Sequence, residues 1–96
     1  MKRHSLEKIL ECTLHCCGIT EKEWQGLKNT RMGKAVRTKQ LVSHIAFSEG
    51  YNHREIAAFL SFTRTTALHH IKTLRDEMMI YPSVQGLVDR IVRMLD

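Results

Sequence analysis

The sequence is poor in residues that break a helix or crosslink a chain, with one proline, five glycines and three cysteines among 96 residues. So little proline and glycine, together with 43% hydrophobic residues, argues against a disordered chain. No apolar run reaches the roughly 18 to 20 residues that cross a bilayer, and the first residues, MKRHSLEKIL, lack the apolar centre of a secretory signal. We therefore expect one small domain over residues 1–96, no membrane partner and no large multidomain enzyme.

Three cysteines within six positions, Cys12, Cys16 and Cys17, do not make the disulfide framework of a secreted domain. A reducing compartment fits them best, and we expect a cytoplasmic protein. Cys12, His15 and Cys16 lie at helical steps, so these three side chains could share a metal ion. A structural zinc site normally takes four ligands, so thiols beside a buried helix face are the preferred interpretation, and no metal is expected.

Strand-like alternation and internal repeats are also missing. Apolar residues instead recur at steps of three and four, the spacing of one helix face. Capping signals at Thr20 with Glu23 and at Asn52 with Glu55 indicate two helix starts. The sequence therefore predicts an all-α fold, a compact domain of five or six helices. The expected helices cover about 5–17, a short stretch from 20, 34–48, a short stretch from 52, 64–79 and 83–95.

Two apolar features need a place in that fold. Ile19 and Trp24 have the spacing of a hydrophobic staple, so we expect Trp24 to anchor the core. Met78, Met79 and Ile80 form an apolar run at a helix end. We interpret this run chiefly as core, with a partner or dimer surface as the alternative.

Acidic residues are absent between Glu23 and Glu49. This interval carries only cations among its charged residues: Lys28, Arg31, Lys34, Arg37 and Lys39. Such a positive field suits a polyanion such as nucleic acid, although a solvated helix face would look the same.

Residues 55–74, EIAAFLSFTRTTALHHIKTL, have the layout of a helix-turn-helix, with a short helix, a three-residue break and a longer helix. Ala57 and Ala67 supply the small side chains that two steeply crossing helices need at their contact. Ser61 stands where many such turns have glycine, and a purely structural helical hairpin is the alternative. The outer side of the longer helix carries groups suited to base edges and phosphates: Arg64, Thr65, Leu68, His69 and Lys72.

Nearly the whole chain resembles the C-terminal DNA-binding domain of the bacterial chromosomal replication initiator family, DnaA, a Trp-repressor-like helical group. Five segments carry the resemblance: the helix Leu6 to Cys17 with its Gly18-Ile19-Thr20 turn, the basic region Lys28 to Lys39, Lys39-Gln40-Leu41-Val42, Glu55-Ile56-Ala57, and Arg64-Thr65-Thr66-Ala67-Leu68-His69. The last of these parallels the family's Asp-His-Thr-Thr-Val-Leu-His.

The resemblance implies that the corner from Thr63 to Thr66 contacts bases in the major groove and that Arg31 or a neighbour reaches the adjacent minor groove. Arg64 stands where the family has His, Thr63 stands where it has Asp, and the preceding turn is one residue shorter. The family's DNA target sequence therefore does not transfer to this chain.

The initiator's ATPase is missing from these residues. A phosphate-binding loop ending at Gly33-Lys34 would need glycine at Lys28, and Ala35 replaces the hydroxyl that binds magnesium. The pair His69-His70 has no nucleophile or orienting carboxylate at a useful spacing. We expect no enzyme activity, no cofactor and no bound nucleotide.

The expected function is sequence-specific binding of double-stranded DNA, as in replication-origin binding or transcription regulation. Arg64, Thr65, Thr66 and His69 are predicted to contact the major groove, with Thr63 at the corner; Lys28, Arg31, Lys34, Lys39 and Lys72 are predicted to hold phosphates or the minor groove. The alternatives are a protein-interaction module or a dimeric repressor on the same fold.

Overall fold

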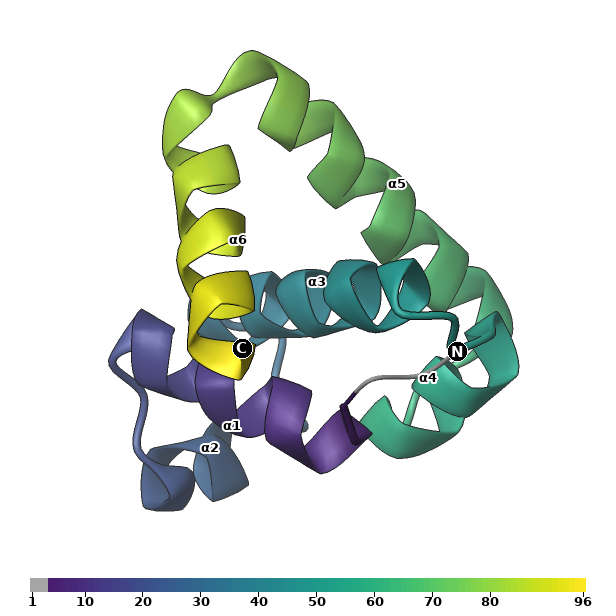
Figure 1. Cartoon of the computed structure of the whole chain (residues 1–96). Helices are drawn as coiled ribbons and strands as arrows, with labels where there is room; N and C mark the ends of the chain where they lie inside the picture. Colours follow the sequence, from purple (N-terminus) through teal and green to yellow (C-terminus); the bar gives the residue numbers. More distant parts are fainter. Residues whose placement is uncertain (1–3) are drawn as a thin grey trace.

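A computed structural model describes residues 4–96 and places six helices and no strand among them (Figure 1). The first three residues of the predicted domain lie outside the described part. The helices are α1 (Leu6–Cys17), α2 (Glu21–Leu27), α3 (Gly33–Ser48), α4 (His53–Leu60), α5 (Arg64–Ile80) and α6 (Pro82–Leu95). The predicted all-α fold is confirmed, and the predicted helix limits differ from the observed ones by about one residue.

The helix starts follow from local side-chain chemistry. Thr20 and Glu23 form a full capping box at α2, because the Thr20 hydroxyl accepts from the Glu23 amide and the Glu23 carboxylate accepts from the Thr20 amide. Asn52 and Glu55 do the same at α4, with distances of 2.9 and 3.0 Å. These bonds satisfy amides that a helix leaves unpaired at its N-terminus.

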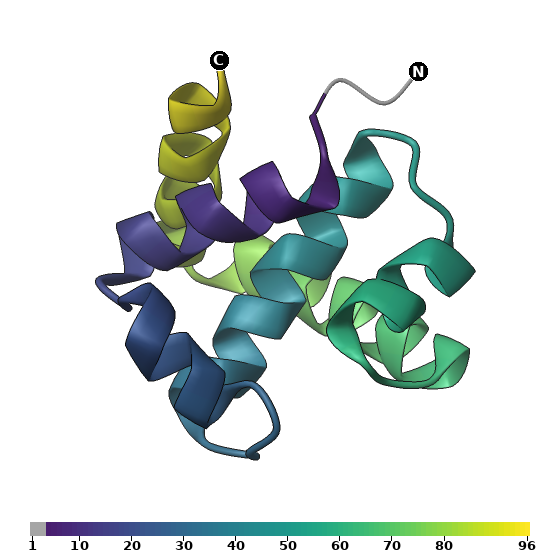
Figure 2. The same cartoon turned by 90° about the horizontal axis from the view of Figure 1, so that it is seen from below.

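Helix α3 is the centre of the packing. It contacts each of the other five helices, and in Figure 2 α1 crosses over it. Residues on several sides of α3 are buried, among them Leu41, Val42, Ile45 and Ala46. A helix with so wide a buried surface has to be covered by several neighbours, which explains its central place.

Trp24 is the anchor of a smaller apolar cluster beside the main core. It is buried with Leu14, Ile19 and Ala35, so α2 is fastened to the end of α1 and the start of α3. The expectation that Trp24 is a core residue is confirmed. This attachment places the segment between α2 and α3 at the edge of the fold.

Helices α5 and α6 converge at an apex away from α3 (Figure 1). The interpretation of residues 78–80 as core is wrong for two of the three, since Met79 is 87% and Ile80 66% exposed, while Met78 is half-buried. The buried stripe of α5 runs through Ala67, Ile71 and Leu74 toward Met78 in steps of four, three and four. Residues 79 and 80 fall off that stripe because each residue turns a helix by about 100°.

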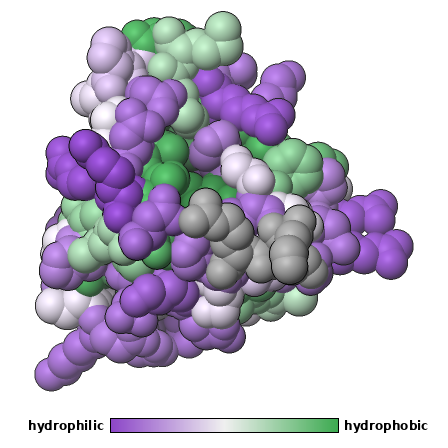
Figure 3. All heavy atoms as spheres, in the orientation of Figure 1, coloured by the Kyte–Doolittle hydropathy of each residue, from purple (hydrophilic) through white to green (hydrophobic). Residues whose placement is uncertain are grey.

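The apex is therefore apolar and open to solvent. In Figure 3 hydrophobic side chains gather there, at the top of the view. Tyr81, between the two helices, is also 54% exposed. None of the six helices combines the length and apolar character that a membrane span needs, within residues 4–96.

Candidate nucleic-acid interface

Helices α4 and α5 are joined by three residues, 61–63, and the joint is a tight, specific turn. Ser61 has φ 61° and ψ 45°, in the left-handed region. The Phe62 amide donates to the Ala57 carbonyl at 3.0 Å, which is the bond pattern of a Schellman helix end. Gly18 ends α1 with the same conformation and the equivalent bond from Ile19 to Leu14. Ser61 thus adopts the left-handed backbone conformation that glycine usually adopts at such a turn.

Thr63 begins α5 as its N-cap. Its hydroxyl accepts from the Thr66 amide at 3.1 Å, and the two threonine hydroxyls lie 2.9 Å apart. These contacts fix the first turn of α5 and hold Thr66 half-buried. Both residues, predicted as DNA contacts, therefore have a structural role at the corner as well.

The outward side of α5 is polar and free of the core. Arg64, Thr65, His69 and Lys72 are exposed, as is Leu68 at 47%. On the opposite side Ala67 is fully buried in the main core. The predicted contact residues of α5, apart from the cap pair, thus share one solvent-facing surface.

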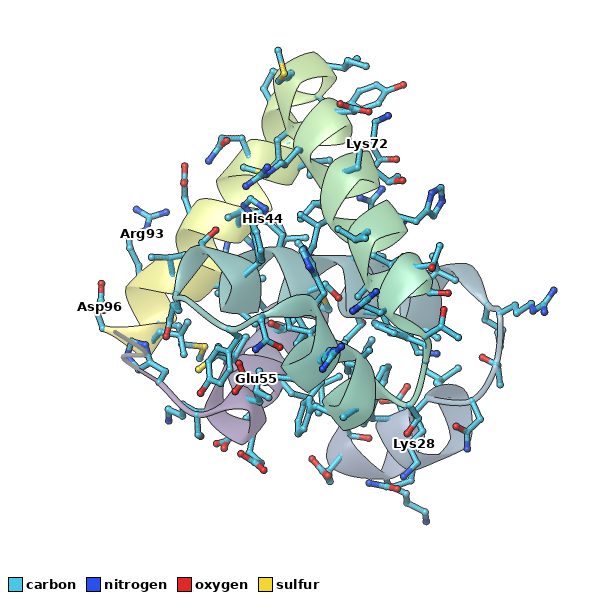
Figure 4. All side chains as sticks on the ribbon, turned by 90° about the vertical axis from the view of Figure 1, so that its right-hand side faces the viewer. Lys28, His44, Glu55, Lys72, Arg93 and Asp96 are labelled. Atoms are coloured by element: carbon cyan, nitrogen blue, oxygen red, sulfur yellow. The ribbon has the colours of Figure 1, made fainter. Side chains whose placement is uncertain are left out.

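The segment from Lys28 to Met32 is ordered by its own hydrogen bonds. The Thr30 hydroxyl donates to the Leu27 carbonyl at 2.8 Å and accepts from the Met32 amide at 3.4 Å. Lys28, Arg31 and Lys34 are exposed around it. Figure 4 looks onto α4 and α5 and shows Lys28 at the lower end of this face and Lys72 at its upper end.

Two cations of the acid-free interval are not simply solvated. Arg37 forms an ion pair with Glu77, which links α3 to α5. Lys39 is half-buried, and burial lowers the pKa of its ammonium group. Arg37 thus joins α3 to α5, whereas Lys39 is a half-buried cation of α3.

A cavity of about 470 Å³ separates the Asn29–Arg31 segment from the helix-turn-helix corner. Its lining brings together residues far apart in the sequence: Asn29, Thr30, Arg31, Val36, Lys39, Ser61, Phe62, Thr66 and His70. Arg31, Lys39 and Thr66, which the sequence predicts as DNA contacts in two separate segments, therefore meet at one place.

His70 is not among the residues that the sequence predicts for the site. The structure buries it, with 9% exposed, and its Nδ1 has no hydrogen-bond partner. Its ring lies 5.2 Å from the Phe62 ring. Its burial could have been predicted from its position three residues after Ala67 and four before Leu74, which is on the buried side of α5.

The cysteines do not gather around a metal position. No group of three or more His, Cys, Asp or Glu side chains among residues 4–96 is arranged to hold a metal ion. Cys12 is buried, His15 is exposed, and the Cys16 thiol contacts the Met94 sulfur at 3.8 Å. Burial raises the pKa of the Cys12 and Cys17 thiols, which favours the unreactive protonated form.

No protein-family model matches the chain, and no curated protein or solved structure is similar enough to be matched to it. The function is therefore argued from the geometry of this interface.

Proposed function

We propose that this chain binds double-stranded DNA in a sequence-specific manner, with α5 as the recognition helix. One observation carries the proposal: the first turns of α5, through Thr66 and His70, line the same cavity as residues 29–31 before α3, which include Arg31, although more than 30 residues separate them in the sequence. A recognition helix needs such neighbours, because base contacts specify a site while phosphate contacts hold the helix in register.

The two sets of residues have different tasks in this proposal. Arg64, Thr65 and His69 contact base edges in the major groove from the exposed start of α5, with Thr63 and Thr66 shaping the corner. Arginine donates two hydrogen bonds to guanine, and a threonine methyl packs on thymine. With 17 residues, α5 is about 25 Å long, enough to lie along the groove.

The cations around the corner hold the backbone. Lys28, Lys34, Lys39 and Lys72 contact phosphates, and Arg31 reaches phosphate or the neighbouring minor groove. The net charge of +5 favours association with DNA at a distance. The resemblance to the replication initiator's DNA-binding domain supports a role at replication origins, in the cytoplasm of a bacterium and without ATPase activity; regulation of transcription uses the same chemistry.

The proposal is tested by titrating a fluorescent duplex with the protein over a range of salt concentrations. Binding should weaken steeply with salt, and Arg31→Gln or Lys34→Gln should each flatten the slope of log K against log salt by about 0.9. Arg93→Gln is the matched control, because Arg93 is exposed on α6, away from Lys28 in Figure 4. Equal slopes for all three variants and the unmodified protein would contradict the proposal.

A protein-interaction module is the second candidate, and the exposed apex favours it. Met79, Ile80 and Tyr81 present an apolar surface that water solvates poorly. If this surface pairs two copies, the chain could also act as a dimeric repressor. Met79→Ser with Ile80→Ser would then lower the molecular mass measured by light scattering and leave duplex binding by each copy intact. A protein that shows no salt-dependent duplex binding but self-associates through the apex would favour this candidate.

A further inference from the structure

The cavity beside the helix-turn-helix corner has the composition of an anion site. Of the nine described residues that line it, two are cations, Arg31 and Lys39, and none is acidic. The other polar groups on its wall are neutral amides, hydroxyls and an imidazole: Asn29, Thr30, Ser61, Thr66 and His70. A concave wall with this charge favours a small oxyanion over a cation or an apolar ligand.

His70 is the unusual member of that wall. A buried polar nitrogen normally has a hydrogen-bond partner, yet its Nδ1 is closed to solvent and has none. Burial lowers the pKa of this imidazole, and the nearby His69 and Lys39 lower it further. Its charged and titratable neighbours are all bases: Lys39 of α3 and Arg31 of the segment before α3 line the cavity with it, and His69 precedes it on α5.

We propose that this cavity is a binding site for one phosphate group, held by Arg31 and Lys39, with the His70 ring on its wall. The bound anion supplies the negative charge that His70 lacks in the free protein. An anion beside an imidazole favours its charged form, so phosphate binding is coupled to uptake of one proton.

The source of the phosphate is the point that rests on the proposed function, because a DNA backbone would bring a phosphate to this corner. Inorganic phosphate offers the same oxygens. Linkage of one proton makes the affinity for a DNA phosphate, whose own charge is constant near neutral pH, rise as pH falls, by at most tenfold per pH unit. The rise spans the interval between the pKa of His70 in the free protein, below its ordinary value of 6.5, and its higher pKa in the complex.

The test is an NMR titration of the histidine ring protons of the whole chain against pH. It is run in sodium chloride, in inorganic phosphate at equal ionic strength, and with a short duplex in chloride. We expect the pKa of His70 to rise in phosphate, with duplex, or in both, and the arm that raises it names the source. An identical His70 titration in all three conditions would overturn the proposal.

His44 provides an internal reference. Its pKa is also lowered, by burial and by Arg75, but it lines a different cavity, between α3 and α6. Its titration should be the same in chloride and in phosphate. An equal rise of the His44 and His70 pKa values would show a general salt effect and would overturn the site.

Variants separate this site from the proposed function as a whole. Arg31→Gln and Lys39→Gln should each reduce the phosphate-induced rise of the His70 pKa, and Arg93→Gln should leave it unchanged. A rise that persists in both cavity variants would overturn the proposal. Duplex binding is measured by fluorescence anisotropy on the same samples. Tight duplex binding with an unresponsive His70 would refute the phosphate site alone, whereas a phosphate response without duplex binding would refute the proposed function alone.

Discussion

The two ends of α5 are built in opposite ways. Its first residues follow a tight turn, are capped by Thr63 and bury Ala67 in the core, while their polar side chains face solvent. Near its other end the Arg37–Glu77 ion pair and half-buried Met78 still attach the helix, but Met79 and Ile80 expose apolar groups. One helix therefore carries a fixed polar surface at one end and an open apolar surface at the other.

This difference indicates which end of α5 is held in a fixed position. The N-terminal end is held by the tight turn from α4 and by the Thr63 cap, so its exposed polar groups have defined positions. Defined positions are what base recognition requires, since a hydrogen bond weakens steeply with misalignment. The C-terminal end offers area without fixed polar geometry, which suits nonspecific apolar contact.

The largest effect should come from removing the packing that fixes α5. Leu74 is fully buried, so Leu74→Ala should lower the free energy of unfolding by about 2 to 5 kcal/mol. Met79→Ala, at the open end, should change it by no more than about 0.5 kcal/mol. Urea denaturation followed by circular dichroism measures both. A similar loss for both variants would show that the buried stripe of α5 contributes no more to stability than its exposed end.

The next effect concerns recognition at the fixed end. Arg64→Ala should weaken binding to a preferred duplex by about 1 to 3 kcal/mol, because a lost bidentate contact to guanine has that size. Binding to random duplexes should weaken much less. Anisotropy titrations with both duplexes measure the difference, with Arg93→Ala as the control. Equal losses on preferred and random DNA would refute a role for Arg64 in reading bases.

Removing the cap should loosen the fixed end. Thr63→Ala deletes the hydroxyl that accepts from the Thr66 amide, so it should lower the free energy of unfolding by about 0.5 to 2 kcal/mol. Thr65→Ala, at an exposed neighbour without a cap bond, should leave stability within about 0.5 kcal/mol. Thermal or urea unfolding of the pair tests this; an unstable Thr65→Ala with a normal Thr63→Ala would contradict it.

The smallest effect is an expected gain at the turn. A left-handed conformation strains a residue with a Cβ by roughly 1 to 2 kcal/mol, and glycine avoids this strain but loses more chain entropy. Ser61→Gly should therefore stabilise the protein by up to about 1 kcal/mol. Gly18→Ala is the reciprocal change, and it should destabilise through φ alone, since an added Cβ meets no atom within 4 Å. Destabilisation by Ser61→Gly would show that the Ser61 side chain contributes contacts of its own.

Much of the fold was predictable because its signals are local. The pairs Thr20–Glu23 and Asn52–Glu55 mark helix starts within four residues, and both form as expected. Ala67, Ile71 and Leu74 have the spacing of one helix face, and all three are buried.

The remaining features depend on contacts between distant residues. The pairing of Arg37 with Glu77 spans 40 positions, and the burial of His70 depends on Phe62 and on the segment before α3. Met79 and Ile80 are a different case, because their exposure follows from their position off the buried stripe of α5. Hydrophobicity alone predicts such residues as buried, so the prediction that they belong to the core is wrong.

Selection of binding sites from a random duplex library tests directly whether the protein recognises a DNA sequence. It should be run at roughly physiological salt with excess nonspecific competitor DNA, where sequence-independent attraction is weakened. We expect an enriched motif with the unmodified protein and a loss of preference at one or two base pairs with Arg64→Ala. No enriched motif, together with no retention of any duplex at low salt, would contradict DNA as the ligand.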